Sequence, residues 1–188
     1  MNSSGDPSYF IPAPLHPFEA DRLAAVREMR GYTGAEDGPM TSLARQAARV
    51  CGAPFGMVSL MEEHQQQFLA CVGASRDPVN RDETFCAYCI LQSEPMVVEN
   101  ALEDPRFKGN PHVLGDRNIR FYVGAPILDH GLPLGTVCVV DTEPHEVSSK
   151  CLLTIERLAQ RASAVLQLRR MVADWQALDE LLMPLVER

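Results

Sequence analysis

Residues 118–141 read NIRFYVGAPILDHGLPLGTVCVVD, and this stretch limits the possible folds more than any other part of the chain. Two long apolar runs flank a link that contains glycine and proline and is too short to hold a helix. The two runs should therefore turn back on each other as an antiparallel hairpin. Because side chains alternate along a strand, Arg120 and Tyr122 should face one side of the sheet and Phe121 the other.

Two earlier segments predict a first hairpin, so that residues 118–141 form the second hairpin along the chain. Residues 55–62 (FGMVSLME) and 67–73 (QFLACVG) are apolar and are separated by a polar turn. A polar loop is expected over 75–81, and the apolar residues of 96–99 predict a further short strand. Residues 100–116 contain several prolines and glycines, so we expect irregular structure there with one short helical turn.

The remaining segments have helical periodicity. The expected helices cover about 18–30, about 41–51, 85–92, and from Ser148 or Ser149 to about Met183. Thr41 and Thr84 are the expected N-caps of the second and third helices. Gly31 and Gly52 should end the first two helices, and Pro184 should limit the last one.

Paired hairpins with helices gathered at both ends predict an α+β fold with one antiparallel sheet and a long C-terminal helix. The length of 188 residues suggests a single domain with extended ends. We expect a flexible arm over residues 1–17, a domain over 18–170 and a helical extension over 171–188.

The charge pattern argues against several classes of partner. The formal net charge is -8 and the basic residues are scattered, whereas nucleic acid binding needs a basic patch. An anionic membrane surface is disfavoured for the same reason. No apolar run is long enough to span a bilayer, and residues 1–18 lack the pattern of a secretory signal. These observations predict a cytoplasmic protein that binds neither nucleic acid nor membrane.

The six cysteines lie mostly inside apolar stretches, at Cys51, Cys71, Cys86, Cys89, Cys138 and Cys151. In a reducing compartment such cysteines are usually small core residues. Cys86 and Cys89 form a CxxC pair, a spacing that redox pairs use because one helical turn brings both sulfurs to one side. The alternative is that both face inward as core residues. A zinc site would need a second CxxC or an HxxxH pair, and the sequence contains neither.

Two charged positions near the second hairpin have both a structural and a functional interpretation. Asp104 can cap a turn that begins at Pro105, with Phe107 in the core, or Asp104 and Phe107 can line a cavity under the irregular segment. Arg120 can lie exposed at the start of its strand. It can also pair with Asp104, Asp141 or an anionic ligand.

The long terminal helix has two different apolar patterns. Its first half carries a wide stripe suited to packing on a domain. In its second half, apolar residues alternate three and four apart, as in a coiled coil, at Leu168, Met171, Trp175, Leu178 and Leu182. This pattern predicts a seam between two copies of the chain. The alternative is that the stripe folds back on the helix of residues 18–30.

Three motifs occur in a characteristic order, namely FCAYCI (85–90), ENALEDPRFKGNPHV (99–113), and IRFYVGAPI (119–127) followed by GLPLGTVCVVD (131–141). With these motifs, residues 22–170 resemble a GAF domain. The resemblance implies a GAF/PAS-like antiparallel sheet with helices on one side and variable loops on the other, and a small-molecule pocket between the sheet and those loops. The pocket residues that it implies are Phe85, Cys86, Cys89, Asp104, Phe107, Arg120 and Phe121.

The chain departs from the motifs of several GAF subtypes. Bilin-binding members carry an attachment cysteine followed by histidine, whereas neither Cys86 nor Cys89 precedes a histidine, and Arg106 stands where their alternative cysteine would be. The Asn-Lys-Phe-Asp-Glu set of cyclic-nucleotide-binding members is not found. Members that reduce free methionine sulfoxide use several cysteines near the pocket, a role open to Cys86, Cys89 and Cys138. The resemblance therefore does not identify a cofactor.

No nucleotide-type glycine loop, HExxH or GxSxG pattern is found in the sequence, so an enzyme is disfavoured. The favoured hypothesis is a sensory or regulatory module that binds a small molecule, dimerises through its terminal helices and signals to a separate output protein. One alternative is a thiol redox sensor or a sulfoxide reductase that uses Cys86 and Cys89. A third possibility is an interaction domain whose pocket is filled by its own side chains.

Overall fold

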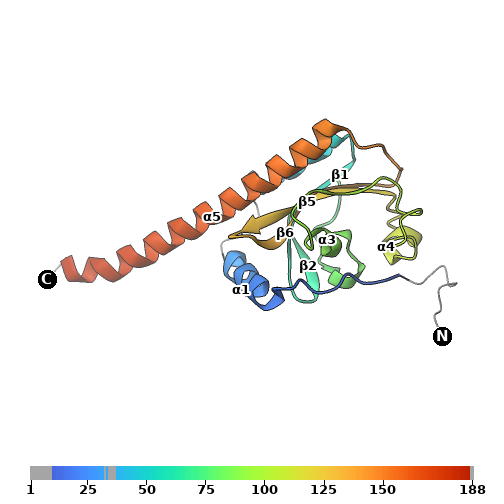
Figure 1. Ribbon diagram of the computed structural model, residues 1–188. Helices are drawn as coiled ribbons and strands as arrows, with labels where there is room; N and C mark the ends of the chain where they lie inside the picture. The colour runs from blue at the N-terminus through green and yellow to red at the C-terminus, as the bar shows by residue number, and fades with distance from the viewer. Residues whose placement is uncertain (1–9, 32, 34–36, 187–188) are drawn as a thin grey trace.

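The computed structural model describes residues 10–31, 33 and 37–186, and side chains as far as residue 179. Six strands form one antiparallel sheet in the order β3-β2-β1-β6-β5-β4. The strands are β1 (Phe55–Met61), β2 (Gln65–Val72), β3 (Val79–Asn80), β4 (Met96–Val98), β5 (Phe121–Asp129) and β6 (Leu132–Asp141). The helices are α1 (Glu19–Arg30), α2 (Gly38–Cys51), η1 (Arg81–Glu83), α3 (Phe85–Cys89), α4 (Pro111–Leu114) and α5 (Ser149–Val186) (Figure 1).

Both predicted hairpins are confirmed. β1 pairs with β2, and β5 pairs with β6 over almost its whole length, from Phe121 opposite Asp141 to Asp129 opposite Leu132. The link of the second hairpin is only His130 and Gly131, which have φ values of 48° and 83°. Two consecutive residues at positive φ are the requirement of a tight hairpin turn whose twist matches that of the flanking strands. Two elements that the sequence did not predict, β3 and η1, begin within the loop expected over 75–81.

The sheet separates two apolar cores. On one face, α1, α2 and α5 pack against side chains such as Phe121 and Val123. On the other face, α3 and the segments around β4 and α4 cover Tyr122, Cys138 and Phe107. The alternation of Phe121 and Tyr122 between the faces is therefore as predicted, and one core of the α+β fold lies on each side of the sheet.

Helix α2 begins earlier than predicted. Its N-cap is Asp37, whose carboxylate accepts a hydrogen bond from the backbone N–H of Met40 at 3.1 Å. The prediction of Thr41 as N-cap is wrong because a proline, Pro39, is well suited to the first turn and extends the helix back to Asp37. The predicted end is confirmed, since Gly52 follows the helix in the left-handed conformation with φ 67°.

A disulfide joins Cys51, the last residue of α2, to Cys151 in the first turn of α5. The expectation that these two cysteines are simple core residues is therefore wrong, because the tertiary fold brings their Cα atoms to 4.9 Å although 100 residues separate them. Cys71, Cys86, Cys89 and Cys138 are free thiols.

Helix α5 lies along the sheet in its first half and extends beyond the domain in its second half (Figure 1). It continues to Val186, so the predicted end near Met183 is wrong; Pro184 stands in the last turn, where it removes one backbone donor without ending the helix. Arg169 and Asp37 form an ion pair of 2.6 Å where the helix leaves the domain. Over the residues that the structure describes, no helix is long and apolar enough to cross a membrane.

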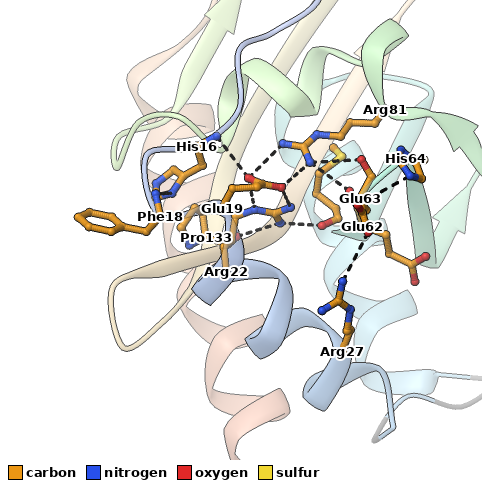
Figure 2. A network of polar contacts seen from close by, with 11 residues as sticks. His16, Phe18, Glu19, Arg22, Arg27, Glu62, Glu63, His64, Arg81 and Pro133 are labelled. Carbon is orange, nitrogen blue, oxygen red and sulfur yellow. Dashed lines mark hydrogen bonds and ion pairs between the residues drawn. The ribbon is translucent and has the colours of Figure 1, made fainter.

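A buried ionic network joins α1 to the β1–β2 turn (Figure 2). The carboxylate of Glu19 accepts hydrogen bonds from Arg22 at 2.7 Å and from Arg81 at 2.5 Å. Arg22 is fully buried and also donates to the backbone carbonyl of Met61 at 2.6 Å. One carboxylate thus balances two buried guanidinium groups, which is necessary because an unpaired buried charge is costly.

The segment before α1 also contacts the domain. The hydroxyl of Tyr88 donates to the backbone carbonyl of Ile11 at 2.7 Å, and Ala13 packs against the core on the α3 side of the sheet. These contacts involve residues 10–17 of the arm that the sequence predicts over residues 1–17. Residues 1–9 lie outside the described residues.

Candidate functional site

A cavity of about 440 Å3 lies between the sheet and the segments that contain α3 and α4. Its walls are mainly apolar and aromatic. They include Phe55, Met57, Phe68, Val79, Phe85, Ile119, Tyr122 and Val140. Polar side chains that also line it are Gln66, Ser75, Thr84, Cys86, His112, Asp116, Arg117, Cys138 and Thr142. An apolar pocket with a few convergent polar groups is the common form of a small-molecule site.

The cavity is covered by a short helix and an irregular segment that local hydrogen bonds hold in place. Thr84 caps α3 as predicted, because its hydroxyl accepts a hydrogen bond from the N–H of Ala87 at 3.2 Å. Asn110 caps α4 through a bond from the N–H of His112 at 2.8 Å, and its amide donates to the carbonyl of Glu83 at 2.9 Å. These caps fix the two elements that carry Cys86 and His112.

The thiol of Cys86 is the centre of a buried polar cluster at the inner end of the cavity. Thr136 and Tyr122 donate hydrogen bonds to its sulfur at 3.1 Å and 3.4 Å. The sulfur of Cys138 lies 3.6 Å away. Thr136 also contacts the hydroxyl of Ser59 at 3.3 Å. Three elements that are distant in the sequence, α3, β5 and β6, thus place their polar groups around one sulfur atom.

The surroundings of Cys86 favour its thiolate. Burial by itself raises the pKa of this thiol, but hydrogen bonds from Cys138, Thr136 and Tyr122 outweigh burial and lower the pKa to about 7. The pKa of Cys138 moves in the opposite direction, because its hydrogen bond to Cys86 and its burial both favour the protonated form. Of the two thiols, Cys86 is therefore the one that holds the negative charge.

A glycine in β5 makes room for this cluster. Gly124 lies opposite Cys138 in the sheet and two residues beyond Tyr122, so all three belong to the same face. A Cβ atom at Gly124 would lie 2.2 Å from the Tyr122 hydroxyl oxygen and 3.0 Å from the Cβ atom of Cys138. Any side chain at this position would push the tyrosine hydroxyl away from the sulfur atoms.

The rim of the cavity carries charged groups and one unsatisfied nitrogen. His112, Asp116 and Arg117 line this region. The Nε2 atom of His112 is buried and has no hydrogen-bond partner among the residues that the structure describes. The carboxylate of Glu83 lies 3.8 Å from it, which is beyond hydrogen-bond range. Burial and the charge of Arg117 lower the pKa of His112, so the neutral ring is favoured.

The structure brings two of the seven ligand-binding residues expected from the sequence, Phe85 and Cys86, to the cavity wall. Phe121 lies on the opposite face of the sheet, in the core against α2 and α5. Cys89 is fully buried in the α3-side core, and its pKa is raised to about 12 by burial and by the neighbouring charge of Cys86. The two cysteines of the CxxC pair lie in the same core, but their surroundings shift the two thiol pKa values in opposite directions.

The other three expected residues make structural contacts next to the cavity. Asp104 caps its turn as expected, since its carboxylate accepts from the N–H of Arg106 at 2.9 Å and also binds the Arg106 guanidinium at 2.6 Å. Phe107 is buried in the core and stacks on Phe85 with ring centroids 4.1 Å apart. Arg120 donates to the backbone carbonyl of Val113 at 2.7 Å. Its guanidinium therefore anchors α4 to the start of β5.

Sequence reasoning missed Gln66, Thr136 and Tyr122 as members of the site. Gln66 and Thr136 are polar residues at buried positions of strands, with exposed fractions of 3% and 0%. A polar residue in an otherwise apolar strand is the signal that would have singled them out, because burial of a polar group requires a partner. The alternation of side chains in the second hairpin predicted correctly that Tyr122 and Phe121 lie on opposite faces of the sheet. It did not predict which face carries the cavity.

Comparison with known proteins agrees with the observed fold. The sequence profile of the GAF domain matches residues 40–166. A cyclic di-GMP phosphodiesterase of Pseudomonas aeruginosa is 35% identical over 127 residues, which cover 67% of this chain and 22% of that protein. This chain therefore matches only about a fifth of the length of that relative.

Two solved structures have the same fold. The GAF domain of an Acinetobacter phosphoenolpyruvate-protein phosphotransferase is 15% identical, with a TM-score of 0.59, and the match covers 82% of this chain and 98% of that one. A type II free methionine-R-sulfoxide reductase from Thermoplasma acidophilum is 11% identical, with a TM-score of 0.58, over 74% of this chain and 94% of that one. With the six-stranded antiparallel sheet, its flanking helices and the family profile over most of its length, this chain belongs to the GAF domain family.

Proposed function

We propose that this protein is a sensory or regulatory module that binds a small organic molecule in the cavity between the sheet and α3. The cavity carries this proposal, because its volume of about 440 Å3 suits a small ligand and its mainly apolar walls include a limited set of polar groups. GAF domains are typical of signalling and sensing proteins, which supports the assignment.

The walls indicate the chemical class of the ligand. Phe55, Phe68, Phe85 and Tyr122 offer aromatic surface, which favours a planar or largely apolar body. The amide oxygen of Gln66 and the remaining lone pair of the Thr84 hydroxyl can accept hydrogen bonds from a polar group on that body, and the free Nε2 atom of His112 can bind another. We therefore expect an aromatic or heteroaromatic molecule with polar substituents at two ends.

Blocking the cavity is expected to abolish ligand binding. Ser75 lines the cavity in an exposed loop, so Ser75→Trp places an indole at the entrance without disturbing the core. Native mass spectrometry of protein purified without added ligand, followed by release and identification of bound molecules, measures occupancy. Fluorescence titration with anilinonaphthalene sulfonate tests protein that is purified empty. We expect the affinity for the co-purified molecule or for the dye to fall about tenfold or more, which is a loss of about 1.4 kcal/mol in the free energy of binding.

Ser93→Trp is the matched control, because Ser93 is also an exposed loop serine but does not line the cavity. This variant should bind as the wild type does. Equal binding by both tryptophan variants, with unchanged circular dichroism, would place the ligand elsewhere and reject the proposed site.

Contacts at the end of the second hairpin support transmission of a signal to α5. Strands β5 and β6 carry Tyr122 and Cys138, which line the cavity. The turn that joins the two strands contacts α5. There, Asp129 accepts hydrogen bonds from Gln167 at 2.9 Å and from Arg170 at 2.9 Å. A ligand that shifts these strands would change the contacts that hold α5 where it leaves the domain.

The proposal includes a homodimer formed through the second half of α5. Leu168, Met171, Trp175 and Leu178 are 48–72% exposed, so within the described residues they do not fold back on α1. The side chain of Leu182, the fifth residue of the expected seam, lies outside the described residues. An exposed stripe of large apolar residues at coiled-coil spacing favours a second copy of the chain as its partner.

Charges placed in the stripe are expected to dissociate the dimer. In the double variant Trp175→Glu with Leu178→Glu, four glutamates would face the seam, and we expect the dimer dissociation constant to rise about a hundredfold or more. Sedimentation velocity at micromolar concentrations measures this change. Ala177→Glu, on an exposed position of the same helix outside the stripe, should leave the dimer intact. A wild-type chain that is monomeric under these conditions would overturn the dimer.

The output is proposed to reside in a separate protein. A cytoplasmic location is also part of the proposal. Four free thiols, at Cys71, Cys86, Cys89 and Cys138, fit a reducing compartment, whereas the Cys51–Cys151 disulfide is of a kind that is rare there.

A further inference from the structure

The inner end of the cavity holds two thiols from different elements. Cys86 belongs to α3 and Cys138 to β6, and their sulfur atoms are 3.6 Å apart. Both residues line the cavity, so a small solute that enters it comes beside both side chains. The two side chains are otherwise buried, with exposed fractions of 3% and 1%, and bulky reagents are therefore excluded.

The hydrogen bonds assign different roles to the two sulfurs. The hydroxyl groups of Thr136 and Tyr122 both donate to Cys86, and either sulfur can be the donor in the contact between Cys86 and Cys138, so that Cys138 donates as well once Cys86 is ionised. Cys86 therefore accepts three hydrogen bonds, an arrangement that stabilises a thiolate. Its pKa of about 7 agrees with this geometry. Cys138 keeps its proton and lies beside the nucleophile, as a resolving thiol must.

The CxxC partner is less suited to this role. Cys89 does not line the cavity, and its raised pKa keeps it protonated. Cys71 is half-buried on β2, with a pKa raised to about 11 chiefly by burial. Cys51 and Cys151 are already joined.

We propose that Cys86 and Cys138 form a redox couple in which a hydroperoxide entering the cavity oxidises Cys86 and Cys138 resolves it to a disulfide. The couple lies in the wall of the proposed ligand cavity, but its oxidation does not require a ligand to bind there. It differs from a redox role of the CxxC pair, because the second sulfur comes from the sheet instead of from the same helix.

The reaction balances in two steps. The Cys86 thiolate attacks one peroxide oxygen, so an S–O bond forms, the O–O bond breaks, and the alkoxide or hydroxide leaves and takes a proton. Cys86 is now a sulfenic acid and the peroxide has been reduced to an alcohol or water. Cys138 then loses its proton and attacks the Cys86 sulfur. The S–S bond forms, the S–O bond breaks, and the departing hydroxide takes the proton as water.

The disulfide would alter the cavity. It would link α3, which covers the cavity, to the central strand β6, which forms its floor. Formation requires the two sulfurs to approach from 3.6 Å to bonding distance, about 2.05 Å, and so draws the helix and the strand together. Thr136 and Tyr122 would lose the thiolate that accepts their hydrogen bonds. Oxidation is therefore expected to change both the volume and the polarity of the ligand site.

Peptide mapping of the full chain tests the proposal. The native protein is treated with one equivalent of hydrogen peroxide at pH 7, denatured, alkylated and digested without reductant. We expect a peptide pair linked through Cys86 and Cys138. Cys71 and Cys89 should still be free thiols after the peroxide treatment and should therefore be recovered in alkylated form. Cys86 should react about tenfold or more faster than Cys71, because a much larger fraction of it is thiolate. In Cys138→Ser, dimedone should trap a sulfenic acid on Cys86.

Two controls make the result decisive. Cys89→Ser should form the same linked pair as the wild type, and Tyr122→Phe, which removes one donor to the sulfur, should slow oxidation of Cys86 several-fold. A link between Cys86 and Cys89 in the wild type would overturn the assignment of Cys138. Unmodified Cys86 at a hundredfold excess of peroxide, in protein with native circular dichroism, would overturn the redox couple itself.

Discussion

Glu19→Gln is expected to lower the free energy of unfolding by about 3–5 kcal/mol, because it leaves two buried guanidinium groups without a counter-charge. Arg22 and Arg81 are 0% and 3% exposed, and both bind the Glu19 carboxylate (Figure 2). Urea denaturation at pH 7 measures the loss. Glu63→Gln is the matched control: Glu63 belongs to the same region but pairs with Arg27 on the surface, so its loss should cost less than about 1 kcal/mol.

The pH dependence of stability provides a second measurement of the same network. Burial raises the pKa of Glu19, but hydrogen bonds from Arg22 and Arg81 outweigh it and lower the pKa from 4.5 to about 2. The stabilisation is therefore fully present above pH 4.5 and is lost as the pH falls towards 2. The difference between the wild type and Glu19→Gln should shrink over this range. A constant difference would show that the charge of Glu19 does not matter.

Phe107→Ala is expected to destabilise the protein by about 3–5 kcal/mol, because it removes a fully buried aromatic ring. The ring is 1% exposed, stacks on Phe85 and meets Tyr88 edge-on with centroids 5.2 Å apart. The guanidinium carbon of Arg106 lies over the Phe107 ring, 5.0 Å from the ring centroid. Thermal and chemical unfolding measure the change.

Phe107→Leu serves as the comparison, since it keeps most of the apolar volume and should cost less than about 1.5 kcal/mol. If Phe107→Ala instead kept wild-type stability and weakened ligand binding, Phe107 would belong to the cavity wall, as the family resemblance implied. The two interpretations that the sequence left open for this residue are thus separated by one pair of variants.

Local patterns were enough to predict most of the fold. The apolar runs of residues 118–141 specify the β5–β6 hairpin, because a link of only two residues forces the two strands to pair side by side. Thr84 and Gly52 mark helix ends through interactions within a few residues, and both were predicted correctly. The start of α2 was missed because two capping residues, Asp37 and Thr41, compete within one turn, and Pro39 favours the earlier one.

The candidate site was less predictable because its members come from several strands and helices. Alternation placed Phe121 and Tyr122 on opposite faces of the sheet, but a single sequence does not say which face carries the cavity. The CxxC spacing predicted Cys86 and Cys89 as a candidate redox pair. Cys138, 52 residues from Cys86, becomes its neighbour only when α3 packs on the sheet.

The sequence by itself determined every strand except β3, the helices α1, α2, α3 and α5, both hairpins and the apolar stripe of the terminal helix, because these depend on spacing along the chain. Only the tertiary structure decided which thiol lies beside Cys86, that Cys51 meets Cys151, and that Glu19 balances two arginines. Such contacts join residues tens of positions apart, and their distances follow from how the layers pack. The chemistry proposed for the cavity depends on those distances, so it emerges from the fold and not from any one motif.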